Sequence, residues 1–296
     1  MKVRFWGVRG SIPSPGPRTM RYGGNTTCIE IRADDGSLII LDGGTGIFPL
    51  AQELLKELPI TAHIFNTHSH WDHIHGLPFF IPIFIPGNTI TLHAAFDPVS
   101  GEGPERIMAV QMQYSYFPVR EAEMKSRIQY AVAMPNEEVT VGSATITPIL
   151  LNHPVVDLGY RVACNGKSVF FTGDHEPHTN IYAPGDEGYA QYQSLIEEQY
   201  RSIVQAIKGV DILIADCAYT IEEYPAKKGW GHGTFDSSIQ MALAAGVKIL
   251  YCTHHEPTRS DDELERVFAE AVARYPHAKQ SGLDIRLASE GTEIEI

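Results

Sequence analysis

The sequence predicts an α/β fold in which two β-sheets pack face to face and helices cover their outer faces. Short apolar or alternating runs recur in two series along the chain, which is typical of strands. Segments with helical spacing lie between and after these runs. The 296 residues, of which 43% are hydrophobic and 20% charged, suit a globular chain with a sizeable core. We find no internal repeat or linker, so residues 1–296 are expected to form a single domain.

The individual elements follow from these patterns in chain order. Apolar or alternating runs predict strands at residues 3–6, 27–31, 38–41, 63–66, 89–93, 144–150, 159–163, 168–172, 212–215 and 247–252. Helical spacing predicts helices at residues 47–58, 104–113, 192–208, 235–245 and 261–274. Asn165-Gly166 is a hairpin turn signal between two of the strands. Residues 86–105 and 175–188 are loop-rich, and they are either substrate-facing loops or plain surface connections.

The charge of the chain limits its partners. A net charge of −13 disfavours a nucleic-acid polymer, because such binding depends on lysine and arginine neutralising phosphates. A small anionic substrate stays compatible with this charge, since bound divalent cations can reverse the sign of a site. The sequence does not fix the oligomeric state, and a homodimer is compatible with it.

The expected compartment is a reducing cytoplasm. The four cysteines form no CxxC pair, so neither a disulfide framework nor a cysteine zinc site is predicted. The N-terminus runs into turn-forming glycines and prolines without the apolar stretch of a signal peptide. The longest apolar run of the first third, residues 77–85, contains two prolines and is too short to cross a bilayer. No membrane segment is predicted.

The strongest functional signal is the motif at residues 68–73, His-Ser-His-Trp-Asp-His, which follows the strand predicted at 63–66. Four metal-competent side chains within six residues cannot share one face of a strand or helix, so they must converge from a loop at a strand end. Imidazoles and a carboxylate suit Zn²⁺, Fe or Mn²⁺. Without a metal, histidines packed this closely would repel one another as they protonate near neutral pH.

This motif resembles the HxHxDH signature of the metallo-β-lactamase superfamily, and further motifs of that superfamily occur in order. The matching residues are Asp42 in a turn after an early strand, then His68, His70, Asp72, His73, His153, Asp174 and His254. The resemblance covers nearly the whole chain. It implies an αββα sandwich of two mixed β-sheets flanked by helices, and a metal-dependent hydrolase.

The resemblance also implies a role for each matched residue. One metal would be held by His68, His70 and His153. The other would be held by Asp72, His73 and His254, with Asp174 bridging the two. Asp72 would in addition position the nucleophile, and Asp42 would support the site from beneath. His255 is the alternative to His254 as the last ligand. The implied cofactors are two divalent metal ions, with Zn²⁺ preferred and Mn²⁺ or Fe as alternatives.

A further pair of residues indicates which branch of the superfamily the chain resembles. Asp216 follows an apolar run and His232 precedes a predicted helix, which resembles the ribonuclease Z and cyclic-nucleotide phosphodiesterase branch. In that branch the acidic residue supports a histidine. Asp216 could hold and charge the His232 imidazole, which could then protonate a departing alkoxide. The alternative is that His232 only packs at the start of the helix.

One departure from ribonuclease Z bears on the substrate. That family inserts a tRNA-binding arm between the metal histidine and the bridging aspartate, whereas only 20 residues separate His153 from Asp174 here. Together with the acidic charge, this favours a phosphodiesterase for a small, cyclic-nucleotide-like diester, with a hydroxide held between two metals as the nucleophile. The alternatives are a thioester or lactone hydrolase, a tRNA 3′ endonuclease-like activity and a metal-binding sensor without turnover.

Overall fold

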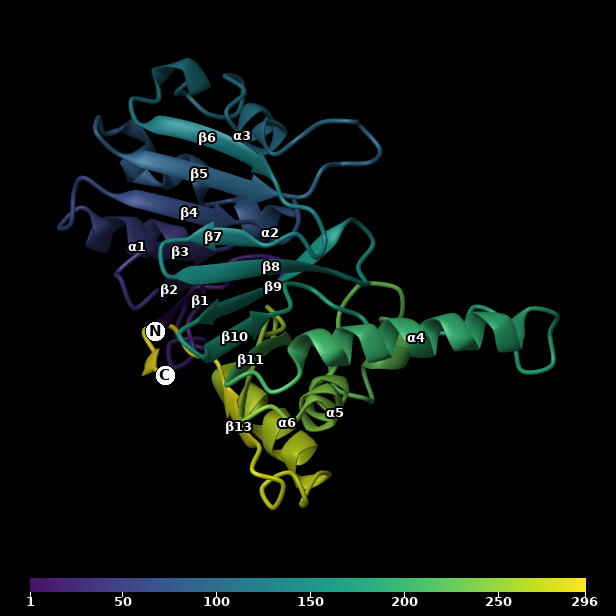
Figure 1. Cartoon of the computed structure of the whole chain (residues 1–296). Helices are drawn as coiled ribbons and strands as arrows, with labels where there is room; N and C mark the ends of the chain where they lie inside the picture. The colour runs from purple at the N-terminus through teal and green to yellow at the C-terminus, as the bar shows by residue number, and fades with distance from the viewer.

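The computed structural model describes residues 1–296 and contains two seven-stranded β-sheets that face each other, with helices outside (Figure 1). The first sheet has the order β14 (Glu293–Glu295), β1 (Lys2–Gly7), β2 (Cys28–Arg32), β3 (Leu38–Leu41), β4 (Thr61–Phe65), β5 (Thr89–Ala94) and β6 (Arg127–Val132). The second has the order β13 (Asp284–Leu287), β12 (Ile249–Thr253), β11 (Ile212–Asp216), β10 (Lys167–Phe171), β9 (Asp157–Cys164), β8 (Ala144–Leu151) and β7 (Val139–Val141).

Both sheets are mixed, which confirms the predicted αββα sandwich. In the first sheet, β14, β1, β2 and β3 are antiparallel and β3 to β6 are parallel. In the second, β7 to β10 are antiparallel and β10 to β13 are parallel. The hairpin of β9 and β10 turns at Asn165 and Gly166, both with positive φ, as the Asn-Gly signal predicts.

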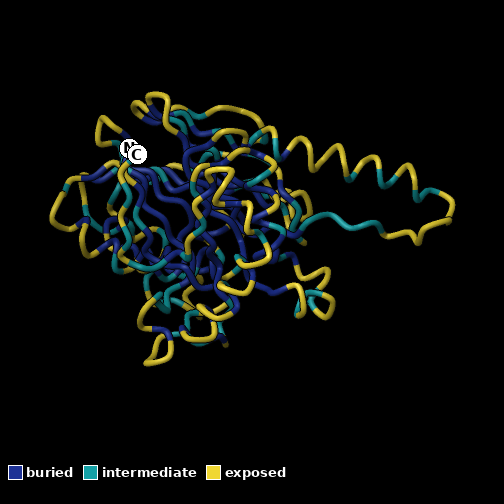
Figure 2. The backbone as a smooth tube through the Cα atoms, turned by 90° about the horizontal axis from the view of Figure 1, so that it is seen from below, coloured by how far each residue is buried: buried dark blue, intermediate teal, exposed yellow.

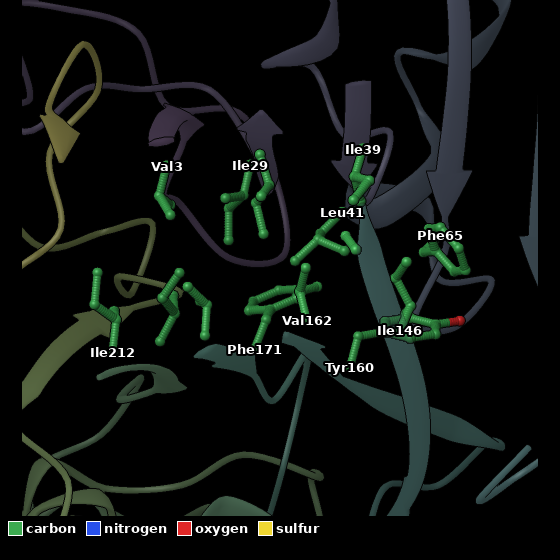
Figure 3. Packing of buried hydrophobic residues seen from close by; sticks show 14 of the residues in the cluster. Val3, Ile29, Ile39, Leu41, Phe65, Ile146, Tyr160, Val162, Phe171 and Ile212 are labelled. Atoms are coloured by element: carbon green, nitrogen blue, oxygen red, sulfur yellow. The ribbon is translucent and has the colours of Figure 1, made fainter. Parts of the chain in front are cut away.

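The main core lies between the sheets, because alternate residues of each strand point inward. Val3, Ile29 and Leu41 of the first sheet face Val162 and Phe171 of the second, and all are fully buried or nearly so (Figure 3). Two further cores lie under the helices. α1 (Ile47–Leu54), α2 (Trp71–Ile74) and α3 (Glu105–Gln111) cover the first sheet. α4 (Tyr189–Ile207), α5 (Phe235–Ala245) and α6 (Asp261–Ala273) cover the second.

The sequence patterns missed nine short elements of the structure. They are β6, β7, β13, β14, α2 and the 3₁₀ turns at Leu77–Phe79, Ile81–Phe84, Glu121–Glu123 and Tyr224–Ala226. The four missed strands are the outermost strands of the two sheets. Helices α1, α3 and α6 end a few residues earlier than predicted, and α4 starts three residues earlier.

Helix α4 projects from the body of the molecule. Its N-terminal part and the segment that leads into it extend far beyond the sheets (Figure 1), and Figure 2 shows this projection in the colours of exposed and intermediate residues. None of residues 179–202, which we call the arm, is buried, and only Ile203 and Ile207 anchor α4. The arm therefore follows Asp174, whereas the interval between His153 and Asp174 holds the β9–β10 hairpin. No helix of the structure has both the length and the apolar composition of a membrane span.

Candidate metal centre

The metal motif begins where β4 ends, and the carboxylate of Asp42 fixes the connecting turn. Asp42 follows β3, which is the neighbour of β4, and its side chain is fully buried. Its Oδ1 accepts from the backbone N–H of Thr67 at 2.7 Å and from the Asn66 amide at 3.1 Å. Its Oδ2 accepts from the Thr67 hydroxyl at 3.0 Å. The turn that precedes His68 is therefore held rigidly against the neighbouring strand.

The single-turn helix α2 then presents the rest of the motif. His70 stands just before the first turn with extended backbone, and Asp72 and His73 lie within the turn. The chain thus reverses direction between His68 and His73, which lets four side chains point toward one centre. This local geometry explains why the motif has no strand or helix periodicity.

The remaining predicted ligands come from the second sheet. His153 follows β8, Asp174 follows β10 and His254 follows β12, so all three leave strands of that sheet at the edge that faces the metal motif. The structure brings all seven predicted ligands together in two groups, within each of which the candidate donor atoms lie within 4.8 Å of one another. One group is His68, His70, His153 and Asp174, and the other is Asp72, His73, His254 and Asp174.

The distances show that donor atoms face each other across each group. In the first, His153 Nε2 lies 3.0 Å from His70 Nδ1, and His68 Nε2 lies 3.6 Å from Asp174 Oδ2. In the second, His254 Nε2 lies 3.1 Å from Asp72 Oδ2 and 3.2 Å from Asp174 Oδ1. Asp174 directs one carboxylate oxygen to each group, as a bridging ligand does.

The buried atoms of these groups fit a pair of divalent cations. His68 Nε2, His73 Nε2 and Asp174 Oδ1 are buried and have no hydrogen-bond partner. Unpaired polar atoms in a protein interior are rare because each costs free energy. Nitrogen and carboxylate oxygen donors are those that Zn²⁺ and related metals use. The donor set therefore fits two metal ions that share Asp174.

The opposite ring nitrogens of the histidines are held by other groups. His73 Nδ1 donates to Asp42 Oδ2 at 2.6 Å, and His153 Nδ1 donates to the Gly231 carbonyl at 2.9 Å. His68 Nδ1 lies 2.9 Å from the buried carboxylate of Asp157. Such contacts fix the ring orientation and leave Nε2 for the metal. Burial lowers the pKa of His68 and of His153, which favours the neutral, metal-binding imidazole.

His254, and not its neighbour, faces the site. His255 Nε2 donates to the carbonyl of Ala288 at 2.8 Å, on the side away from the metal groups. Burial lowers the pKa of His255 to about 3, so it is neutral at physiological pH. Of the other histidines nearby, His175 is buried beside Asn152 and Asp216, and the His75 ring lies tilted against the Trp71 ring with 5.3 Å between centroids.

The predicted acid pair adjoins the second metal group. His232 Nδ1 donates to Asp216 Oδ2 at 3.0 Å and lies 3.7 Å from Asp174 Oδ2. The His232 ring stacks on the His254 ring with 4.7 Å between centroids. Burial lowers the pKa of His232, but the carboxylates of Asp216 and Asp174 outweigh this effect and raise it to about 9. The two carboxylates thus favour the charged form of His232, which is the form that a proton donor needs.

Sequence reasoning missed the buried carboxylate of Glu176. It accepts from the Tyr224 hydroxyl at 2.7 Å and from the backbone N–H groups of Gly229 and Gly231, each at 2.8 Å. It thereby holds the loop that carries both His232 and the carbonyl that orients His153. No motif marks this position, since its partners are mostly backbone amides about fifty residues further along the chain.

The loop after β1 was also missed, although it lies against the second metal group. The backbone N–H of Ser11 donates to Asp72 Oδ2 at 2.7 Å. At Gly10, an added Cβ would lie 2.2 Å from the Cε1 atom of the His254 ring, so only glycine fits there. The glycine itself is a weak sequence signal, because it stands in a segment rich in glycine and proline.

Comparisons with known proteins show the family and the fold of the chain. The profile of the Beta-lactamase superfamily domain matches residues 38–255. Ribonuclease Z of Agathobacter rectalis is 26% identical over 291 residues, which cover 90% of this chain and 92% of that protein. The metallo-beta-lactamase fold protein YhfI from Bacillus subtilis superposes with a TM-score of 0.68 at 17% identity, covering 99% of each chain. A diphosphatase from the PhnP family superposes with a TM-score of 0.64 at 20% identity. The match covers 100% of this chain and 97% of that protein.

Proposed function

The chain belongs to the Beta-lactamase superfamily domain family, and from this premise we propose that it is a metal-dependent phosphodiesterase for small diesters of the cyclic-nucleotide kind. The observation that carries the proposal is the His232–Asp216 pair beside the metal groups, with 3.0 Å between Nδ1 and Oδ2. A phosphodiester has an alkoxide leaving group that needs a proton, and this pair supplies one at the site. A thioester hydrolase has less need of a proton donor, because a thiolate departs more readily than an alkoxide.

In the proposed reaction, different residues would bind the metals, orient the nucleophile and donate a proton. His68, His70 and His153 would hold one metal, Asp72, His73 and His254 the other, and Asp174 both. Two bound divalent metals, for which we propose Zn²⁺, would supply Lewis-acid charge and activate a water molecule. The carboxylate of Asp72, fixed by the Ser11 N–H, would orient the nucleophile. His232, whose Nδ1 is engaged by Asp216, would give the proton on Nε2 to the leaving oxygen.

Two features support a small substrate over a tRNA. The interval where ribonuclease Z would insert its arm is filled by the β9–β10 hairpin. The arm that this chain does have carries four carboxylates and a single arginine, and the whole chain has a net charge of −13. These negative charges repel the phosphates of an RNA, whose binding depends on cationic side chains. A small diester needs to be neutralised only by the metals.

The test of the proposal is the dependence of a mutational effect on the leaving group. An alkoxide needs a proton to depart, whereas 4-nitrophenolate leaves readily without one. General acid catalysis typically contributes roughly 10²–10⁴-fold. His232→Ala should therefore reduce kcat by about this factor on a cyclic-nucleotide or alkyl diester and much less on an aryl diester. Asp216→Asn should show the same pattern more weakly, because the amide still orients the ring but no longer favours its charged form.

Elemental analysis must find the same metal content in both variants and in the wild type. His277→Ala, which removes an exposed histidine far along the chain from the site, is the matched control and should leave both activities unchanged. Equal losses on the two substrates would assign His232 to binding or packing. That result would remove the reason for preferring a phosphodiesterase to a thioester hydrolase.

A further inference from the structure

A cleft of about 340 Å³ opens beside the metal centre, and its walls are mostly apolar. This volume is at the lower end of the range for small-molecule pockets, roughly 300–1,000 Å³. The walls come from α2, from the loop after β5, from α3 and from the loop after β8. The apolar side chains that form them are Trp71, Ile74, Phe96, Ile107, Val110 and Val155.

Several of these side chains are exposed although they are large and apolar. The exposed fractions are 57% for Trp71, 45% for Phe96 and 38% for Val155. Single exposed apolar residues are common on protein surfaces, but a group of them around one concavity marks a binding site. The cleft is therefore built to cover an apolar group that water would otherwise surround.

The cleft is continuous with the metal centre. His68 and Ser69 of the metal motif line it, and so do Val155 and Val156, which follow the candidate ligand His153. His232 and Asp216 do not line it. A substrate held at the metals can therefore place one organic group in the cleft, while the group that receives the proton from His232 lies elsewhere.

The charges of the cleft disfavour an anionic occupant. Its charged side chains are Asp97, Glu102 and Arg106, and Arg106 is already paired with Glu102. No unpaired cation is left to bind the next phosphate of a nucleic acid. The charges therefore disfavour an anion, and the mostly apolar walls favour an uncharged occupant.

We propose that this cleft binds an uncharged, apolar organic group of the substrate, about the size of an aromatic ring system. In an open diester it is the group that remains on phosphorus after the leaving oxygen departs, and in a cyclic nucleotide it is the base. This inference rests on the proposed phosphodiesterase function and deepens it. The preferred substrates are small diesters that carry one aromatic substituent, and not diesters of small alcohols.

The first experiment keeps the leaving group constant and varies the group that stays. Metal-loaded protein is given phenyl 4-nitrophenyl phosphate or methyl 4-nitrophenyl phosphate, and each kcat/KM is divided by the uncatalysed rate constant. Burying a phenyl ring should favour the first substrate by roughly tenfold or more. Phe96→Ala removes an apolar side chain that lines the cleft, and Val110→Asp adds a charge to it. Both variants should bring the ratio of the two normalised kcat/KM values close to one. Phe48→Ala, an equally exposed phenylalanine on α1 outside the cleft, is the matched control and should keep the ratio.

The second experiment measures binding without turnover. Phenylphosphonate and methylphosphonate, which cannot be hydrolysed as esters, are titrated into the same proteins by calorimetry. Phenylphosphonate should bind roughly tenfold tighter to the wild type and to Phe48→Ala, but not to the two cleft variants. Equal binding of both phosphonates by the wild type would overturn the cleft proposal. A phosphonate preference without hydrolysis of either diester would instead overturn the phosphodiesterase and leave the cleft as an apolar binding site.

Discussion

Three residues at the metal centre have left-handed backbone, which residues other than glycine seldom adopt. Their φ angles are 62° at Ser11, 62° at Asp42 and 56° at His254. Each such conformation costs on the order of 1–3 kcal/mol and persists only where the surroundings enforce it. Here the conformation aims the Ser11 N–H at Asp72, the Asp42 carboxylate at the turn before His68, and the His254 ring at Asp174. The left-handed backbone at these residues thus lowers the stability of the fold, but it places the polar groups of the site.

We predict that Glu176 supports metal binding by holding the loop that orients His153. Glu176→Gln replaces one acceptor oxygen by a donor, which then faces the N–H of Gly229 or of Gly231 in place of an acceptor. The loop should loosen, and with it the Gly231 carbonyl that orients His153. Loss of such an outer partner typically weakens metal affinity or activity by about 10–100-fold. We expect the first metal to be lost to a chelator at a concentration about tenfold lower than in the wild type.

The matched control for this variant is Tyr224→Phe, which removes one hydrogen bond to Glu176 and keeps both bonds to the backbone amides. Its metal retention should stay close to that of the wild type. Thermal unfolding of both variants in the presence of excess metal separates a local effect from a general loss of stability. Equal metal retention by Glu176→Gln and the wild type would mean that Glu176 plays no part in positioning the site.

The sequence predicts the donors of the site far better than their supports. The seven candidate ligands stand in motifs that resemble those of a known superfamily, and the structure brings all seven together. Glu176 and Asp157 stand in no motif. A carboxylate that supports a site can come from any part of the sequence that the fold brings within hydrogen-bond distance. Glu176 contacts backbone amides and Asp157 contacts one ring nitrogen. Such contacts cannot be predicted from the types of the neighbouring residues in the sequence.

At the scale of elements, the strands that the sequence patterns missed share one property. β6, β7, β13 and β14 are the edge strands of the two sheets. An edge strand has a neighbour on one side only, and charged residues on it prevent aggregation with other chains. β13 and β14 accordingly read Asp-Ile-Arg-Leu and Glu-Ile-Glu, with hardly any buried side chain. Central strands bury both faces and therefore stand out as apolar runs.

A prediction for the arm follows from its charge. The wild type should cleave small diesters and leave precursor tRNA intact at physiological salt. Replacing Glu187, Glu197 and Glu198 by lysine should raise RNA affinity by about tenfold or more at low salt and steepen its salt dependence, since each cation can neutralise a phosphate. Hydrolysis of the small diester should not change, because the arm extends away from the body (Figure 2).

Glutamine at the same three positions removes the negative charge without adding a positive one and serves as the control. Binding of a fluorescent tRNA at several salt concentrations, together with a gel assay of 3′ trimming, provides the measurement. Efficient trimming of tRNA by the wild type would show that neither the acidic arm nor the short interval before Asp174 limits the substrate.

At the scale of the whole molecule, the metal centre joins the two sheets. The metal motif follows β4 of the first sheet, and His153, Asp174 and His254 follow strands of the second. Metals bound there should stabilise the docked sheets. A ligand at about a thousand times its Kd adds roughly 4 kcal/mol to the free energy of unfolding. Removing the metals with a chelator should therefore lower the Tm by several degrees.

His254→Ala tests the same prediction on one half of the site. It should lose the metal held by Asp72 and His73 preferentially and keep the other, so that elemental analysis falls from two ions per chain toward one. The fall in Tm on chelation should shrink accordingly. His255→Ala is no suitable control, since its ring is tied to Ala288 in the core; His277→Ala serves instead. Active protein without metal, or a Tm that chelation leaves unchanged, would contradict the two-metal centre.

Except for β14, the last strand, which joins the first sheet, the two sheets come from consecutive halves of the chain, and this sets an order of events during synthesis. Strands β1 to β6 leave the ribosome before any strand of the second sheet, and the metal motif leaves with them. At about 5–20 residues per second, on the order of ten seconds or more pass before His254 emerges. Throughout that time the nascent chain carries an incomplete set of donors, which binds metal weakly. Tight loading of a two-metal centre would thus be a late event in the life of the chain, and it would depend on the metal available after translation rather than during it.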